Sequence, residues 1–176
     1  MASRTIALVI GTLICMSAAP ALGQQKFKYS FKTPPGISKY TQQHVLEVGD
    51  VPGHQIRIAE IHTKFASEAP EYDGVKVVET WGRLTSDYSN GNGRLVPYTV
   101  LHMANGDKIF HRGEGISHSA AAADGSKRIS YSNVLTITGG TGKFANLRGL
   151  LRQTGFSDLK TGTSDSQTEG EYWYEK

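Results

Sequence analysis

The chain has 176 residues and a formal net charge of +3, with side chains of both signs spread along its length. A charge this small does not favour binding to nucleic acid or to an acidic membrane surface. The single cysteine, Cys15, lies close to the N-terminus, so neither a disulfide framework nor a cysteine metal site is expected in the folded part.

Residues 1–23 are predicted to be a secretory signal peptide. Arg4 provides a positive start, residues 6–16 are apolar, and Ala21-Leu22-Gly23 is a small-x-small cleavage site. The apolar run is too short to span a bilayer stably, although a retained N-terminal anchor is an alternative. We therefore predict a secreted or periplasmic protein with no stable membrane insertion after cleavage.

Residues 24–43 are expected to form a partly loose N-terminal arm, and residues 44–176 a single β-barrel domain. Pro34-Pro35-Gly36 interrupts any long strand in the arm. Segments rich in Val, Ile, Thr, Tyr and Trp alternate in steps of two and are separated by turn signals such as Asn90-Gly91 and Asn105-Gly106. They predict strands at 26–31, 44–48, 54–62, 75–87, 94–104, 107–118, 128–138, 148–157 and 168–175.

The fold class predicted from these strands is all-β, a closed antiparallel β-barrel of about eight strands. Residues 142–147 are the best candidate for a helical turn, and longer helical patterns are missing. Closing the sheet would remove exposed strand edges without the help of disulfides.

Alternation along residues 54–62 separates two faces of one strand. The odd positions carry Gln55, Arg57, Ala59 and Ile61, while the even positions carry His54, Ile56, Ile58, Glu60 and His62. We expect the even face, with its two isoleucines, to point into the barrel and to carry Glu60 with it. Burial would raise the pKa of such a carboxyl and prepare it for proton transfer. The alternative is a solvent-facing Glu60 with Ile61 turned inward.

Three stretches resemble the allene oxide cyclase family. They are Leu135-Thr136-Ile137-Thr138-Gly139-Gly140-Thr141-Gly142-Lys143-Phe144 with the later Gly149, then Gly93-Arg94-Leu95-Val96-Pro97-Tyr98-Thr99, and Ile58-Ala59-Glu60-Ile61-His62. They occur in the family's order, and dirigent proteins share a similar GGTG-type turn in a related barrel. The glycines of this turn permit a tight reversal, with phosphate binding as the alternative interpretation.

The resemblance implies site residues for an isomerase or cyclase. Glu60 lies where the family places the glutamate that promotes epoxide opening, and His62 lies where an asparagine helps to hold a water. Val96 and Tyr98 match cavity-lining positions, and Ile58 and Val100 complete the predicted substrate-binding set. The alternatives are a strand-end His62 exposed to solvent and simple core packing for Val96 and Tyr98. Val100 departs from a polar asparagine of the family, which puts the allene-oxide substrate in doubt.

Two further functions compete with the cyclase. One is a non-catalytic binder of a small hydrophobic molecule, and the other is a dirigent-like or structural protein. The resemblance also implies a possible homo-oligomer, a trimer. No cofactor and no metal site are predicted, because His111 and His118 fall on opposite faces of their strand and the H-x-H ligand pair of cupin-like sites is missing.

Overall fold

The computed structural model describes residues 24–121, 127–158 and 163–176, so the predicted signal peptide lies outside the described residues. The prediction of an all-β chain is confirmed: every strand pairing is antiparallel, and one short 3₁₀ helix, η1 (Gly142–Phe144), is present in the described residues. The strands are β1 (Lys26–Thr33), β2 (Ser38–Glu47), β3 (His54–Lys64), β4 (Glu71–Tyr72), β5 (Val75–Ser89), β6 (Asn92–Met103), β7 (Lys108–Ala121), β8 (Lys127–Gly140), β9 (Leu147–Asp158) and β10 (Thr163–Tyr174).

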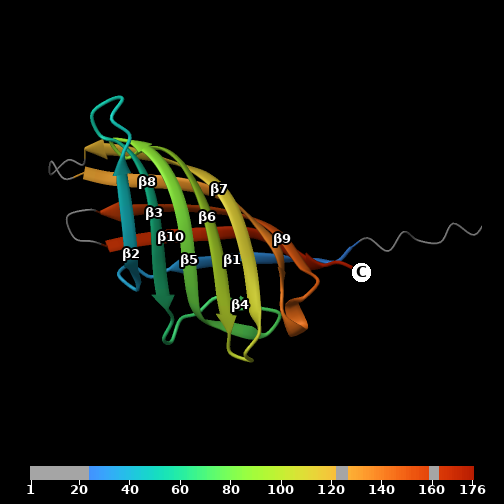
Figure 1. Ribbon diagram of the computed structural model, residues 1–176. Helices are drawn as coiled ribbons and strands as arrows, with labels where there is room; N and C mark the ends of the chain where they lie inside the picture. The colour runs from blue at the N-terminus through green and yellow to red at the C-terminus, as the bar shows by residue number, and fades with distance from the viewer. Residues whose placement is uncertain (1–23, 122–126, 159–162) are drawn as a thin grey trace, which may run out of the picture.

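The strands form one sheet in the order β1-β10-β9-β8-β7-β6-β5-β3-β2, with the short β4 paired to β5 (Figure 1). The two end strands, β1 and β2, do not pair with each other. The sheet is therefore open, and the closed barrel of about eight strands is not what the described residues form.

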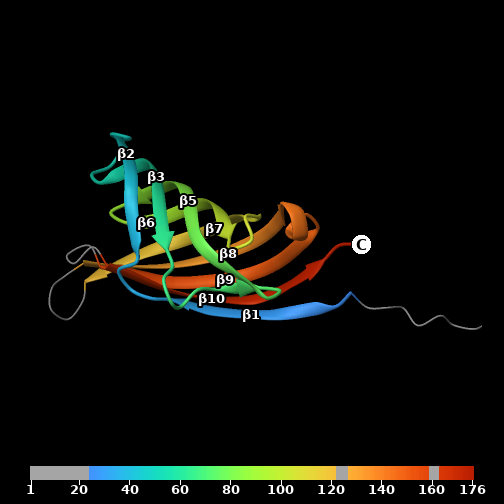
Figure 2. The ribbon, with the colours of Figure 1, turned by 90° about the horizontal axis from the view of Figure 1, so that it is seen from below.

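The sheet is nevertheless strongly curled, as Figure 2 shows. The reason is in the connectivity, because β1 and β2 are neighbours in sequence but lie at opposite ends of the strand order. Residues 34–37 join them, and five residue steps reach at most about 18 Å. Nine strands laid flat would separate the two edges by about 38 Å. A chain with this topology must bring its edges towards each other.

Residues 24–43 are not the loose arm that we expected. β1 pairs with β10 along its whole length, from Lys26 opposite Trp173 to Thr33 opposite Ser166. Phe27, Tyr29 and Phe31 alternate with lysines and a serine, so one side of β1 is apolar, and it is partly buried.

One face of the curled sheet, which we call the inner face, carries the core. Its buried cluster contains Tyr72, Val77, Leu101, Met103, Ile109, Leu135, Ile137, Phe144, Leu147, Leu151 and Tyr172. We call the other side the outer face.

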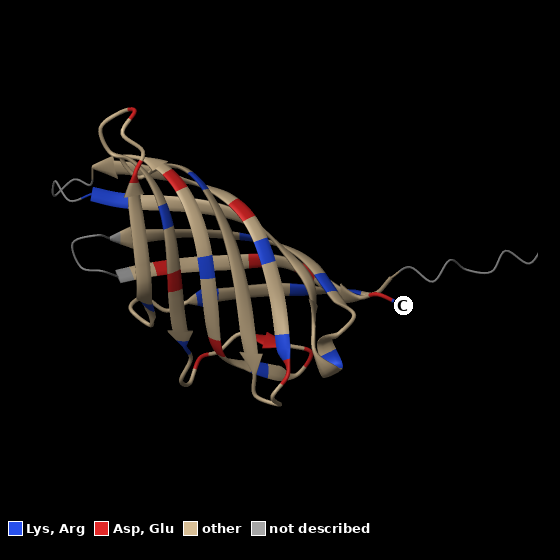
Figure 3. Ribbon diagram, viewed as in Figure 1, with Lys and Arg blue, Asp and Glu red and all other residues tan. Residues whose placement is uncertain are grey.

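The charged residues are not gathered in one place: basic and acidic residues are interspersed over the strands in Figure 3.

The segment around β4 packs against β1 and β10 at one edge of the sheet. Tyr72 is fully buried, and its ring lies 4.7 Å from that of Tyr29 on β1 and 5.2 Å from that of Tyr172 on β10. Nearby, the rings of Phe31 and Phe65 meet edge to face at 5.7 Å. These aromatic contacts hold the β1–β10 side of the sheet against the β5 side without strand pairing.

The glycine-rich segment forms the turn between β8 and β9. A Cβ on Gly140 would lie 2.2 Å from the backbone oxygen of Lys108, and Gly142 has a φ of +50°. Phe144 follows and is fully buried in the core. The segment thus reverses the chain tightly and places the Phe144 side chain in the core, which is the role expected of a structural turn.

Candidate functional site

Glu60 lies on the outer face, so its expected inward orientation is wrong. Its neighbours along β3, Ala59 and Thr63, are the buried ones, whereas Ile58 is 56% exposed. β3 pairs with β5 without a register shift, so this is the orientation of the whole strand and no local bulge causes it. The alternative with Ile61 on the inner face is the observed one.

The carboxylate of Glu60 is already paired on the outer face, where 16% of the side chain is exposed. Its Oε2 lies 2.8 Å from Nη2 of Arg83, and its Oε1 accepts a hydrogen bond of 2.7 Å from Thr41. A guanidinium and a hydroxyl therefore already satisfy the carboxylate on the solvent side of the sheet.

His62 shares the outer face with Glu60 but pairs with another residue. Its Nε2 lies 2.8 Å from Oε2 of Glu79, and its ring stacks on Trp81 with centroids 4.2 Å apart. The hydrogen bonds from His62 and from the Trp81 indole hold the pKa of Glu79 below its usual value. This cluster lies on the outside of the sheet.

The four predicted substrate-binding residues also lie on the outer face. Tyr98 is half exposed and lies under the Arg112 guanidinium, and Val96 and Val100 flank it on β6. The register sets three rows across β3, β5 and β6: Ile58–Thr85–Val96, Glu60–Arg83–Tyr98 and His62–Trp81–Val100. Sequence parity thus correctly grouped Ile58, Glu60 and His62 on one side of β3 and Val96, Tyr98 and Val100 on one side of β6, but both sides are turned towards solvent.

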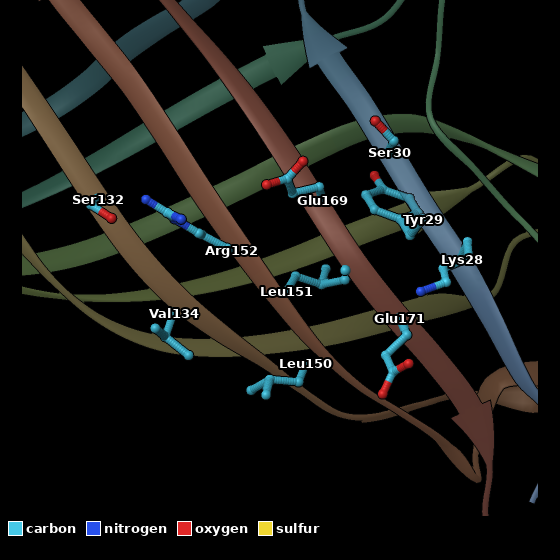
Figure 4. Close-up of a pocket in the computed structure, with 11 residues that line it drawn as sticks. Lys28, Tyr29, Ser30, Ser132, Val134, Leu150, Leu151, Arg152, Glu169 and Glu171 are labelled. Atoms are coloured by element: carbon cyan, nitrogen blue, oxygen red, sulfur yellow. The ribbon is translucent and has the colours of Figure 1, made fainter.

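A shallow hollow lies over β1, β8, β9 and β10, mainly on the outer face (Figure 4). Val134 and Leu150 form an apolar patch in it, and both are more than half exposed. The surrounding charges are mixed, with Lys28 and Arg152 near Glu169 and Glu171. A balanced set of charges around an open, shallow surface does not select one class of ligand.

The inner face divides into the apolar cluster described above and a second part, which we call the polar half. Two neighbouring rows of the sheet define it. The first runs Arg57–Ser86–Leu95–Gly115–Asn133–Gln153–Thr168, and the second runs Gln55–Tyr88–Gly93–Ser117–Tyr131–Gly155–Ser166. Hydroxyl, amide and phenol groups dominate these rows, and Arg57 supplies a cation.

The phenols of the polar half sit in a partly desolvated environment. Burial raises the pKa of Tyr131 to about 12, and it also raises the pKa of Tyr88. Tyr88 and Tyr131 belong to one row of the inner face, and Tyr40 of β2 lies on the same face. The Arg57 guanidinium lies over the Tyr40 ring, 4.8 Å from its centroid.

Several buried atoms of the polar half have no hydrogen-bond partner among the described residues. They are Nε of Arg57, Oγ of Ser86 and Oδ1 of Asn133. Arg57 and Ser86 lie opposite each other in the β3–β5 register, so two of these atoms come from neighbouring positions.

Arg57 is the sequence feature that could have indicated this site. Arg57 stands between Ile56 and Ile58 in a strand, and an arginine on a face that also carries Ala59 and Ile61 is unusual for a core. The tyrosines and Asn133 come from other strands, and only the register of the sheet places them on the same face as Arg57.

The phosphate-binding interpretation of the glycine-rich turn conflicts with its hydrogen bonds. The Thr141 amide donates to the Lys108 carbonyl at 2.9 Å, and the Lys143 amide donates to Oδ2 of Asp107 at 3.1 Å. A carboxylate already occupies the position where an anion would bind.

No group of three His, Cys, Asp or Glu side chains within the described ranges is arranged to hold a metal ion. His111 is buried on the inner face and His118 is exposed, so their opposite orientation is as predicted. Over the same part of the chain, no helix has the length and apolar character needed to cross a bilayer. No family model, curated protein or solved structure matches this chain.

Proposed function

We propose that this protein binds a small molecule non-catalytically against the polar half of its inner face. The observation that carries the proposal is the set of unpartnered buried atoms on Arg57, Ser86 and Asn133. Buried polar atoms in folded proteins almost always have a partner, so three exceptions along one row of the inner face indicate that a ligand or ordered water completes them.

The polar half is open to solvent on the β2 side. Tyr40 is 48% exposed and Val45 is 52% exposed, although both belong to the inner face. A ligand can therefore approach between the two unpaired edges of the sheet. Tyr40 and Val45 also offer it apolar surface, in keeping with the small hydrophobic molecule expected as the partner.

The geometry favours this binder over a cyclase acting through Glu60. A group that opens an epoxide must face the substrate inside a water-excluding cavity. Glu60 instead pairs with Arg83 on the outer face. Allene oxide cyclase-like activity therefore stays an expectation from the sequence resemblance, as do a dirigent-like role, the trimer and export from the cell.

A fragment screen by NMR tests the proposal. We expect amphipathic fragments to shift the amide resonances of Tyr88 and Tyr131 and the side-chain Nε–H resonance of Arg57. Fragments that shift only the resonances of Val134 and Leu150, in the hollow of Figure 4, would overturn the proposal. An absence of hits would overturn it as well.

A pair of variants on β8 supplies the control. Asn133→Leu keeps the branched shape of the side chain and removes the amide from the inner face, whereas Thr136→Leu changes an exposed residue of the outer face. We expect the first to weaken binding of the fragments about fivefold or more, as for loss of one hydrogen bond, and the second to leave it unchanged.

A further inference from the structure

We infer that the ligand of the polar half is a small organic anion whose carboxylate is held by the edge of the Arg57 guanidinium. This inference rests on the proposed function and narrows it to one chemical class. It follows from the position of Arg57, from its lack of an acidic partner and from the apolar surface beside it.

Arg57 has no ion-pair partner among the described residues, whereas Arg83 and Arg148 pair with Glu60 and Glu175. The other described arginines without an ion pair are exposed, and Arg57 is partly buried. Its Nε is buried and makes no hydrogen bond. Taking a cation out of water is costly unless a counter-charge or acceptor replaces the lost hydration. An anionic ligand would supply both.

The contact with Tyr40 does not replace such a partner. Stacking on an aromatic ring uses the flat face of the guanidinium and leaves its N–H groups, which lie in its plane, free to bind an acceptor. The two Nη groups make no hydrogen bond to the described residues and are not among the buried atoms, so they form a fork that matches the two oxygens of a carboxylate. Tyr40, whose ring centroid lies 4.8 Å from Cζ of Arg57, offers such a ring to the guanidinium.

The neighbouring groups also suit an anion. Across the sheet, Ser86 and Asn133 are neutral, and Tyr88 carries a hydroxyl that can donate a hydrogen bond. Among the described residues, Glu47 at the end of β2 is the acidic side chain that shares this face, and it accepts a hydrogen bond from Gln55.

One cation favours a monoanion over phosphate. A phosphate group carries nearly two charges at neutral pH, and the second would stay uncompensated in a partly buried site. A carboxylate carries one charge, which Arg57 balances. The organic part of the ligand would cover Tyr40 and Val45, which are otherwise apolar surfaces half exposed to water.

Matched neutral and charged probes test the inference on the unaltered protein. We expect benzoate and hexanoate to bind about tenfold or more tightly than benzamide and hexanamide, measured by calorimetry or by the shift of the Arg57 Nε–H resonance. Binding of the amides equal to that of the acids would overturn the organic anion but leave the proposed binder standing. Inorganic phosphate binding more tightly than both acids would also overturn it.

Variants then assign the charge to Arg57. Arg57→Gln should abolish the preference for the acids, and Arg57→Lys should keep only part of it, because lysine retains the charge and loses the fork. Arg112→Gln is the matched control, since Arg112 lies over Tyr98 on the outer face. A preference that survives Arg57→Gln in a folded protein, or disappears in Arg112→Gln, would contradict the assignment.

Discussion

At the scale of single residues, His111 has the most unusual environment of the titratable groups. It lies on the inner face of β7 next to the Tyr72 ring, and its Nε2 has no hydrogen-bond partner. Burial lowers the pKa of His111 to about 4, because the charged imidazolium cannot be solvated there. The folded protein therefore holds this histidine neutral under conditions in which an unfolded chain would protonate it.

This environment predicts a loss of stability in acid. Between about pH 6.5 and pH 4 the unfolded chain binds a proton at residue 111 and the folded protein does not. The free energy of unfolding should thus fall as the pH falls through this window, by up to about 3 kcal/mol from this group. Urea unfolding at several pH values should show a flatter profile for His111→Asn.

The exposed His118 on the same strand provides the control. His118→Asn should keep the pH dependence of the unaltered protein. An equal slope in the His111→Asn variant and the unaltered protein would mean that His111 is protonated in the folded state.

At the scale of elements, the β8–β9 turn depends on a carboxylate from another hairpin. Asp107, in the turn before β7, accepts hydrogen bonds from the Lys143 amide at 3.1 Å and from the Asn105 side chain at 2.8 Å. A Cβ on Gly142 would lie 2.1 Å from Oδ1 of this aspartate. The glycine therefore makes room for Asp107, and Asp107 in turn ties the two turns together.

Loss of the Asp107 carboxylate should loosen this end of the sheet. We expect Asp107→Ala to lower the free energy of unfolding by about 1–3 kcal/mol, since it leaves the Lys143 amide and the Asn105 side-chain amide without their acceptor. Glu114→Ala, at an exposed position of β7, should change it by less than about 0.5 kcal/mol. Similar values for the two variants in urea unfolding would show that the turn does not need Asp107.

At the scale of the whole molecule, side-chain packing replaces the missing pairing between β1 and β2. Tyr72 contacts the rings of Tyr29, Tyr172 and His111, which belong to β1, β10 and β7. Asp73 adds polar links, because it accepts a hydrogen bond from Tyr174 at 3.2 Å and pairs with Lys143 at 3.0 Å. The short β4 thus brings together three separate parts of the curled sheet.

Truncation of Tyr72 should therefore destabilise the molecule as a whole. We expect Tyr72→Ala to cost about 3–5 kcal/mol, the range for an aromatic ring removed from a core. Tyr98→Ala, on the outer face and half exposed, should cost below about 1 kcal/mol. Thermal unfolding measures both, and a small cost for Tyr72→Ala would show that β4 does not hold the sheet together.

The amino-acid sequence by itself determined the secondary structure and the grouping of residues by face. Nine of the strand segments follow from two-residue alternation and turn residues, because these are local properties of the chain. The two-residue β4 was missed, since it is too short to show a period. For the same local reason, parity placed Glu60 with His62 on one side of β3, and Val96 with Tyr98 on one side of β6.

Only the tertiary structure decided which face is inside. Both sides of β3 carry apolar residues, with Ile56 and Ile58 on one and Ala59 and Ile61 on the other, so alternation gives two equivalent choices. The choice depends on the direction in which the sheet curls, and that is set by contacts between strands far apart in sequence. The same curling puts Arg57, Tyr40 and Tyr131, from three different strands, on one inner face, which no local pattern can indicate.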